Sequence, residues 1–330
     1  TKEKVGWAWP ASEGDDAKIV TALKRGSQAT LSARSSRGTQ TKDTFSLLGF
    51  TAAIEDADQR INLNATGNTY GSLSTDSGQT WRHVNPYTLF PASDGGVCCD
   101  QRVLYIPNLD MTVWFIQYRR SSTTRTGGFR IAVARSKADL RAGRWFSYYW
   151  NTRNFGNLAN SGLDQWFDFP DISASRDYLY IASNVFNFSS QYTNSAVIRM
   201  RLAGLDGSGS IGAVYYLRSG GPGPMGGGAS YRFTQTYNGS RPASMYWASH
   251  NNTASLKLFR WDDGSGGRAS DVSRSIPAWT SGAGSSPGPD GRSWNGRDDH
   301  RIGSGYVFGS EGAFLWSSRN NGSGRPQSYV

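Results

Sequence analysis

Short apolar runs alternate along this chain with glycine, proline, aspartate and asparagine, and the clearest example is the segment 98–150. Its runs are seven to nine residues long and rich in valine, isoleucine and aromatic residues. Such runs, closed by turn residues, predict four antiparallel strands joined by tight turns. They cover residues 101–107, 111–119, 129–136 and 144–150. Because one four-stranded sheet cannot bury both of its faces alone, we expect similar units elsewhere.

Comparable units of short runs lie on both sides of this segment. They cover residues 44–83, 166–218 and 231–279, the last ending in a strand near Ile276–Trp279, and a fifth begins after residue 299. A spacing of about 50–60 residues with four strands per unit is typical of β-propeller blades. The expected fold is therefore all-β, a propeller of four-stranded antiparallel blades. Five repeats are visible, and rings of five, six or seven blades all stay open, the last if the chain is part of a longer propeller.

The N-terminal residues do not share this repeat. We expect residues 1–40 to form an extension that precedes a propeller domain at 41–330. Asp15–Arg25 predicts a short helix within the extension, since acidic residues begin it, basic residues end it and Gly26 follows as a stop signal. The segment Ser32–Thr41, rich in serine, arginine and threonine, predicts a loop.

One octet has the form of a structural motif. Residues 74–81, Ser-Thr-Asp-Ser-Gly-Gln-Thr-Trp, match the pattern S-x-D-x-G-x-T-W at every specified position, Ser74, Asp76, Gly78 and Trp81 included. We expect a turn between two strands in which Asp76 accepts backbone N–H bonds and Gly78 supplies a positive φ. Trp81 is expected to pack beneath the turn. The octet predicts fold rather than chemistry.

With this octet, the chain resembles the sialidase-like, BNR/Asp-box β-propeller superfamily. Gly95–Gln101 and Trp166–Ser173 are similar to stretches of bacterial propellers of unassigned activity, and the resemblance covers residues 45–330. It implies a propeller whose relatives include glycosidases, polysaccharide lyases and proteins that only bind. Phe129–Ala132 is similar to the arginine motif of true sialidases but lacks its proline, and we interpret it as an ordinary strand. Sialidase activity itself is therefore not expected.

Composition adds a preference for polyanions. The chain carries 35 Lys and Arg against 25 Asp and Glu, a net charge of +10, and 40 glycines with 12 tryptophans. Positive charge steers polyanions toward a protein, although a basic solvated surface would look the same. No nucleic-acid-binding signature accompanies the charge, so we expect an acidic polysaccharide or glycoconjugate as partner rather than nucleic acid. No apolar run is long enough to span a membrane.

The two cysteines, Cys98 and Cys99, are neighbours in the chain. Adjacent Cα atoms lie about 3.8 Å apart, closer than ordinary disulfide geometry requires, so a bridge here would close a strained eight-membered ring. Two interpretations stay open: a vicinal disulfide acting as a stiff apolar plate beside a binding site, or two buried free thiols. A secreted protein, whether extracellular, periplasmic or on the cell surface, favours the disulfide.

Candidate chemistry lies where each blade begins, because the loops that enter the innermost strands surround one mouth of a propeller channel. An acidic residue recurs at three of these entrances. The candidates for acid or base catalysis are Asp100, Asp168, Asp299 and His300. Three roles stay open for the acids: work on a glycosidic bond, binding of Ca²⁺, or capping of turn N–H groups.

Other residues near these entrances are candidates for holding the substrate. They are Arg297, Arg301, Gln101, Trp166, His250 and Tyr306. Arginines hold carboxylates, aromatic rings stack on sugars, and a histidine near an acid can transfer protons. We therefore expect a secreted carbohydrate-active protein for acidic glycans, either a glycoside hydrolase or a uronate polysaccharide lyase. The alternatives are a non-catalytic glycan- or protein-binding propeller and a structural extracellular module.

Overall fold

A computed structural model gives the architecture, and the chain divides into two units that are considered separately. The smaller unit comprises Thr1–Leu63 with Ser74–Thr80, and the larger unit comprises Asn64–Leu73 with Trp81–Val330. The structure describes residues 18–19, 21–23, 25–34, 40–46, 63–76, 78–159, 161–162, 164–207, 211–219, 230–236, 241–266, 269–281, 290–291, 301–318 and 327–329.

The smaller unit contains an antiparallel strand pair, β1 (Gln28–Arg34) and β2 (Gln40–Ser46). Residues 18–25 are helical wherever they are described, as the sequence predicts. The prediction of a loop over Ser32–Thr41 was wrong at both of its ends, because strands extend into it. The physical reason is that β1 alternates polar and apolar residues, the period of a strand, so its pattern outweighs the serine-rich composition.

Two sheets of the larger unit are four-stranded antiparallel meanders, as predicted for the segments 98–150 and 166–218. The first contains β6 (Arg102–Ile106), β7 (Met111–Gln117), β8 (Gly128–Ala134) and β9 (Phe146–Asn151). The second contains β10 (Gln165–Ala174), β11 (Tyr178–Asn187), β12 (Tyr192–Arg201) and β13 (Ala213–Ser219). A three-stranded sheet precedes them, with β3 (Leu63–Gly67), β4 (Tyr70–Ser74) and β5 (Arg82–Val84).

The remaining strands form one seven-stranded sheet, in the order β17-β16-β15-β14-β18-β19-β20. Its strands are β14 (Arg232–Thr236), β15 (Ser244–Asn252), β16 (Ser255–Asp262), β17 (Ser270–Ser275), β18 (Ser304–Phe308), β19 (Glu311–Ser318) and β20 (Gln327–Tyr329). The expectation that the last two units form separate sheets was wrong. β14 and β18 pair in parallel, with Thr234 opposite Gly305, so β18 gains partners along what would otherwise be an exposed edge.

The last strand of the 231–279 unit also differs from the prediction, because β17 ends before Ile276. The backbone N–H groups of Ile276 and Trp279 bond instead to the carbonyls of Ala254 and Thr253, in the turn between β15 and β16. Trp279 is buried in a cluster with Trp316. Its burial there explains the apolar residues that suggested a strand.

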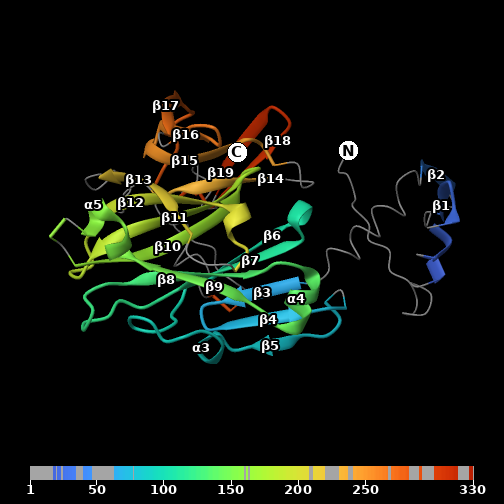
Figure 1. The fold of residues 1–330 in the computed structure, drawn as a ribbon. Coiled ribbons are helices and arrows are strands. Elements are labelled where there is room, and N and C mark those ends of the chain that lie inside the picture. The colour runs from blue at the N-terminus through green and yellow to red at the C-terminus, as the bar shows by residue number, and fades with distance from the viewer. Residues whose placement is uncertain are drawn as a thin grey trace. The chain divides into compact units, whose positions relative to one another are not determined.

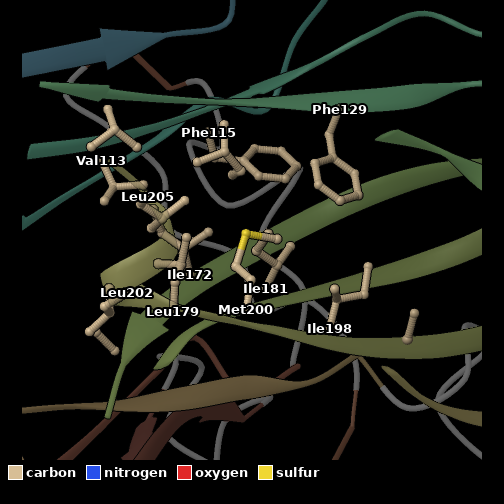
Figure 2. Close-up of a cluster of buried hydrophobic side chains, with 14 of the residues drawn as sticks. Val113, Phe115, Phe129, Ile172, Leu179, Ile181, Ile198, Met200, Leu202 and Leu205 are labelled. Carbon is tan, nitrogen blue, oxygen red and sulfur yellow. The ribbon is translucent and has the colours of Figure 1, made fainter. Parts of the chain in front are cut away.

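Consecutive side chains along a strand enter different cores, because neighbouring side chains of a strand point to opposite faces. Tyr178 and Tyr180 of β11 pack toward the β14–β16 strands, whereas Leu179 and Ile181 pack toward β7 and β8. Figure 2 shows the second core, in which Phe115 and Phe129 face Ile181 and Met200 across the gap between the two sheets. The central strands of both four-stranded sheets are thus buried on both faces.

The first strands of successive sheets are neighbours, since β10 contacts both β6 and β14. Figure 1 shows these sheets following one another in chain order through the larger unit. Short helices fill the connections: α3 (Pro86–Leu89), α4 (Lys137–Ala142) and α5 (Gly156–Ala159), with 3-10 turns η1 (Pro107–Leu109), η2 (Thr152–Asn154) and η3 (Leu202–Gly204). The first strands β6, β10, β14 and β18 are therefore neighbours, and the described residues at their starts can contribute to one site.

Candidate functional site

Charged residues from four strand entrances gather around the ring of Phe169. Arg232 begins β14 and Arg301 precedes β18, and their guanidinium carbons lie 4.2 Å and 3.6 Å from the centroid of this ring. Such distances are those of cation–π contacts. The residues Asp100, Arg102, Asp168, Phe169, Arg232 and Arg301 are called the arginine–aspartate site below.

A bulge in β10 gives Phe169 its position. Asp168 pairs with Asn184 and Asp171 pairs with Ala182, so two residues of β10, Phe169 and Pro170, oppose a single residue of β11. Phe169 has a φ of +57°, a conformation that a bulky residue rarely adopts. Pro170 lacks an N–H and cannot donate to the ladder, which favours a bulge at this point.

The Asp168 carboxylate is held by hydrogen bonds. Its Oδ1 accepts from Gln117 Nε2 at 3.1 Å and from the Phe169 backbone N–H at 2.9 Å. Its backbone carbonyl accepts from the Ser183 hydroxyl at 2.8 Å. Because one donor comes from β7 and another from β11, the orientation of Asp168 is fixed by two sheets.

Asp100 is electrostatically coupled to Asp168. Burial raises the pKa of the Asp100 carboxyl above its usual range, and the negative charge of Asp168 raises it further. Arg102, the Phe169 backbone amide and Arg232 act on this pKa in the opposite direction. Asp100 therefore holds its proton to higher pH than an exposed aspartate would, which is the property required of a general acid.

Asp171, a third acid at the β10 entrance, has a structural contact. Only 8% of it is exposed, and its Oδ2 accepts from the Phe233 backbone N–H at 2.9 Å, which ties β10 to β14. Burial raises the pKa of Asp171, whereas Arg232, the Phe233 N–H and Arg102 lower it. Asp171 therefore links two sheets and does not cap a turn N–H group, because Phe233 lies within β14.

Three members of the site were missed from the sequence: Arg102, Phe169 and Arg232. Arg102 and Arg232 are the first residues of β6 and β14, so the rule that examined strand entrances covers both. Among the arginines at strand entrances, only Arg297 and Arg301 were expected from the sequence to belong to the site. The signal for Phe169 is Pro170, because a proline inside a strand-like run indicates a bulge.

The structure also describes three further candidates that are not among the six residues of this site. Gln101 is buried, and its Oε1 accepts from Trp114 Nε1 at 2.7 Å. His250 lies on β15 against Trp279 and Trp316, with ring centroids 4.7 Å and 5.1 Å from its own. Tyr306 is exposed on β18.

Trp166 lies at the start of β10, and its Nε1 donates to the Asn187 carbonyl at 3.0 Å. Arg297, Asp299 and His300 lie outside the described residues. They precede Arg301 in the chain, and this position is the reason for keeping them as candidates for the site.

Cys98 and Cys99 form a vicinal disulfide, with their sulfur atoms 2.05 Å apart. The chain before it runs along the end of β7: Cys98 N–H donates to the Gln117 carbonyl, and Arg119 N–H donates to the Gly96 carbonyl, both at 2.9 Å. Of the two interpretations of this cysteine pair, the structure therefore shows the disulfide. The hydrogen bond from Cys98 holds the disulfide against β7.

The octet at 74–81 forms a tight turn. Asp76 Oδ1 accepts from the Thr80 backbone N–H and from the Ser74 hydroxyl, both at 2.8 Å, and Gly78 has a φ of +85°. Trp81 was expected to be covered, but 46% of it is exposed. It precedes β5, an edge strand of three residues whose first two are also exposed, so burial does not extend to this end of the sheet.

Within the part of the chain that the structure describes, no group of three or more His, Cys, Asp or Glu side chains could hold a metal ion. None of the helices in the same residues is long and apolar enough to cross a membrane.

Comparison with known proteins gives one match. Residues 11–58 match the model of a family described as Invasion associated locus B (IalB) protein. This stretch is well under half of the chain and precedes the larger unit, so it carries no conclusion about the arginine–aspartate site. A search of curated proteins finds no match.

Proposed function

We propose that this protein is a secreted, sialidase-like β-propeller that hydrolyses glycosidic bonds in an acidic glycan. The observation that carries the proposal is the coupling of Asp100 and Asp168 beside three arginines. Paired carboxylates with different surroundings are the usual apparatus of glycoside hydrolysis. Arginines beside them suit a substrate that carries its own carboxylates.

In this proposal Asp100 is the general acid, because burial and the charge of Asp168 raise its pKa. It donates its proton to the leaving glycosidic oxygen. Asp168 is the second carboxylate, which either activates a water molecule or attacks the anomeric carbon. The anomeric configuration of the first product separates these two routes.

The three arginines have different roles in this proposal, because they differ in solvent exposure. Arg102 is exposed and Arg301 is partly exposed, so these two bind the carboxylate of the glycan. Arg232 is buried beneath them and positions Phe169. Asp299, His300 and Arg297 are candidates through their place in the chain before Arg301, and His300 would be the base if the reaction were elimination instead.

A closed ring of blades is part of the proposal. Its support is the order of the inner strands, in which β10 contacts β6 and β14, and β14 pairs in parallel with β18. Secretion is supported by the vicinal disulfide, since disulfides persist in oxidising compartments.

The test incubates the purified protein with uronic-acid polysaccharides and follows reducing ends together with the ultraviolet absorbance of unsaturated products. Hydrolysis gives reducing ends without the absorbance. Asp100→Asn should lower the rate by about 10²–10⁴-fold, the usual contribution of a general acid. Asp177→Asn, which alters an exposed aspartate paired with Arg176, should leave the rate unchanged. Reducing ends that appear with absorbance and disappear in His300→Ala would replace hydrolysis by a lyase reaction.

A non-catalytic binding protein is the second candidate. Asp168 already accepts hydrogen bonds from Gln117 and Phe169, as a structural acid would. Retained binding on a glycan array without any product would favour this candidate and contradict hydrolysis.

A further inference from the structure

A pocket of about 350 Å³ lies at the end of β7, beside the vicinal disulfide. Its lining includes Cys98, Gln117, Arg119, Arg120, Trp166 and Ser190. Gln117 connects it with the arginine–aspartate site, because the Nε2 of this side chain donates to Asp168. A ligand that extends past Asp168 would therefore meet this pocket next.

One hydrogen-bonding atom of Gln117 has no partner among the described residues. Its Nε2 donates to the Phe167 carbonyl at 3.0 Å and to Asp168 Oδ1 at 3.1 Å. Both partners are acceptors, which fixes the orientation of the amide. Among the described residues no donor reaches its Oε1, although the side chain is only 1% exposed. A buried acceptor without a donor is unfavourable.

Arg120 supplies a positive charge to the pocket, and its guanidinium is held by neighbouring residues. Its guanidinium carbon lies 5.5 Å from the ring centroid of Trp166 and 5.4 Å from that of Phe188. Its Nη1 donates to the Phe188 carbonyl at 2.8 Å and to the Ser190 hydroxyl at 3.4 Å. A guanidinium held in this way loses little freedom when it binds a carboxylate, and this pre-organisation favours affinity.

The disulfide gives the pocket a rigid apolar wall. Cys98 is fixed to β7 through the Gln117 carbonyl, and the preceding Asp94 accepts from the hydroxyls of Thr124 at 2.7 Å and Thr126 at 2.9 Å. Ligand pockets combine such apolar surface with a few well-placed polar groups. The C–H face of a sugar ring fits against a surface of this kind.

We infer that this pocket is a subsite for one uronate residue of the glycan, adjoining the site of bond cleavage. Arg120 binds the carboxylate of that residue, and Cys98 of the disulfide contacts its apolar face. The inference rests on the proposed function and names the feature of the substrate, a negative charge on the neighbouring sugar, that this pocket selects.

The test measures affinity by calorimetry for a disaccharide and a hexasaccharide of pectate, alginate, hyaluronan and heparin, with methyl-esterified hexasaccharides beside them. Arg120→Gln should weaken hexasaccharide binding about tenfold or more, the usual effect of losing a charge-assisted hydrogen bond. Affinity for the disaccharide and the ester should not change. Arg125→Gln is the matched control, because Arg125 also lies over Phe188, at 4.9 Å, but pairs with Asp164 and does not line the pocket.

Unchanged hexasaccharide affinity in Arg120→Gln would overturn the subsite and leave the proposed function standing. Failure of the wild-type protein to bind any of the four acidic series would overturn the proposed function and the subsite together, without reference to any variant. The two failures are therefore distinguishable.

The disulfide is tested separately. Reduction of the wild-type protein with dithiothreitol should weaken hexasaccharide binding several-fold and leave disaccharide binding unchanged, and reoxidation should restore it. The variant Cys98→Ser/Cys99→Ser should match the reduced protein, with circular dichroism as the check that it folds. Equal affinity of the oxidised and reduced proteins would remove the disulfide from the subsite.

Discussion

The guanidinium carbon of Arg301 lies 3.6 Å from the ring centroid of Phe169, although Arg301 precedes β18 and Phe169 belongs to β10. The contact exists because a bulge turns the Phe169 backbone to a φ of +57°. The ring therefore sets the position of a charge carried by another sheet.

Phe169→Leu should weaken binding of acidic glycans about three- to tenfold, because the arginines lose a cation–π contact worth about 1 kcal/mol or more. Calorimetry with a uronate hexasaccharide measures this change. Phe308→Leu is the matched control, since Phe308 is 63% exposed on β18. Equal affinity of Phe169→Leu and the wild-type protein would show that the ring does not position the arginines.

Arg102→Gln should move the alkaline limb of the pH–rate profile to higher pH. Arg102 lowers the pKa of Asp100 by favouring its charged form, so removal of Arg102 raises that pKa further. A general acid works while it is protonated, so activity then persists to higher pH. The measurement is kcat against pH. Arg144→Gln, at an exposed arginine paired with Asp139, should leave the profile in place, and a shift to lower pH in Arg102→Gln would contradict the role of Asp100.

Phe115→Ala should lower the free energy of unfolding by about 3–5 kcal/mol, because it opens a cavity in the core between the two four-stranded sheets. Phe115 is fully buried, and its ring stacks on Phe129 at a centroid distance of 5.3 Å. Denaturant titration measures the loss. Val272→Ala, at a 41% exposed position of β17, should change stability by no more than about 0.5 kcal/mol.

Asp76→Ala should speed hydrogen exchange of the Thr80 amide at neutral pH, because that amide donates to the Asp76 carboxylate. Hydrogen bonds from the Thr80 side chain, the Thr80 backbone and the Ser74 side chain lower the pKa of Asp76 below its usual 3.8. The contribution of this carboxylate is therefore complete above 3.8 and is lost as the pH falls through its lower folded value.

In the wild-type protein, protection of Thr80, corrected for the intrinsic exchange rate, should accordingly decrease only in acid. Thr75→Ala changes an exposed residue of the same turn and should preserve protection at neutral pH. Slow exchange of Thr80 in Asp76→Ala would mean that other contacts hold the turn.

The sequence allowed much of the larger unit to be predicted, because strands and tight turns leave local signals. The runs that became β6 to β9 are rich in valine, isoleucine and aromatic residues and end at turn residues, so their existence follows from nearby positions alone. The parallel pairing of Thr234 with Gly305 has no such signal, since it joins residues far apart in the chain. Nothing local distinguishes a fifth separate unit from an extension of the fourth.

The candidate site was predictable in its acids and not in its geometry. Asp100 and Asp168 were found by their position before or early in a first strand, and the structure brings them together. The bases Arg102 and Arg232 occupy equivalent positions but were not sought. The aromatic ring between the charges depends on a bulge, and the backbone twist at Phe169 is a consequence of pairing with β11 that residue type alone does not reveal.

The alternation of side chains along β11 between two cores affects how the protein can partially unfold. Tyr180 belongs to one core and Ile181 to the next, so β11 cannot leave its place without exposing both. Partial unfolding that frees a single sheet of this kind would expose apolar surface on two sides. The sheets on either side of β11 should therefore behave as one cooperative unit in native-state hydrogen exchange, with their slowest amides opening together.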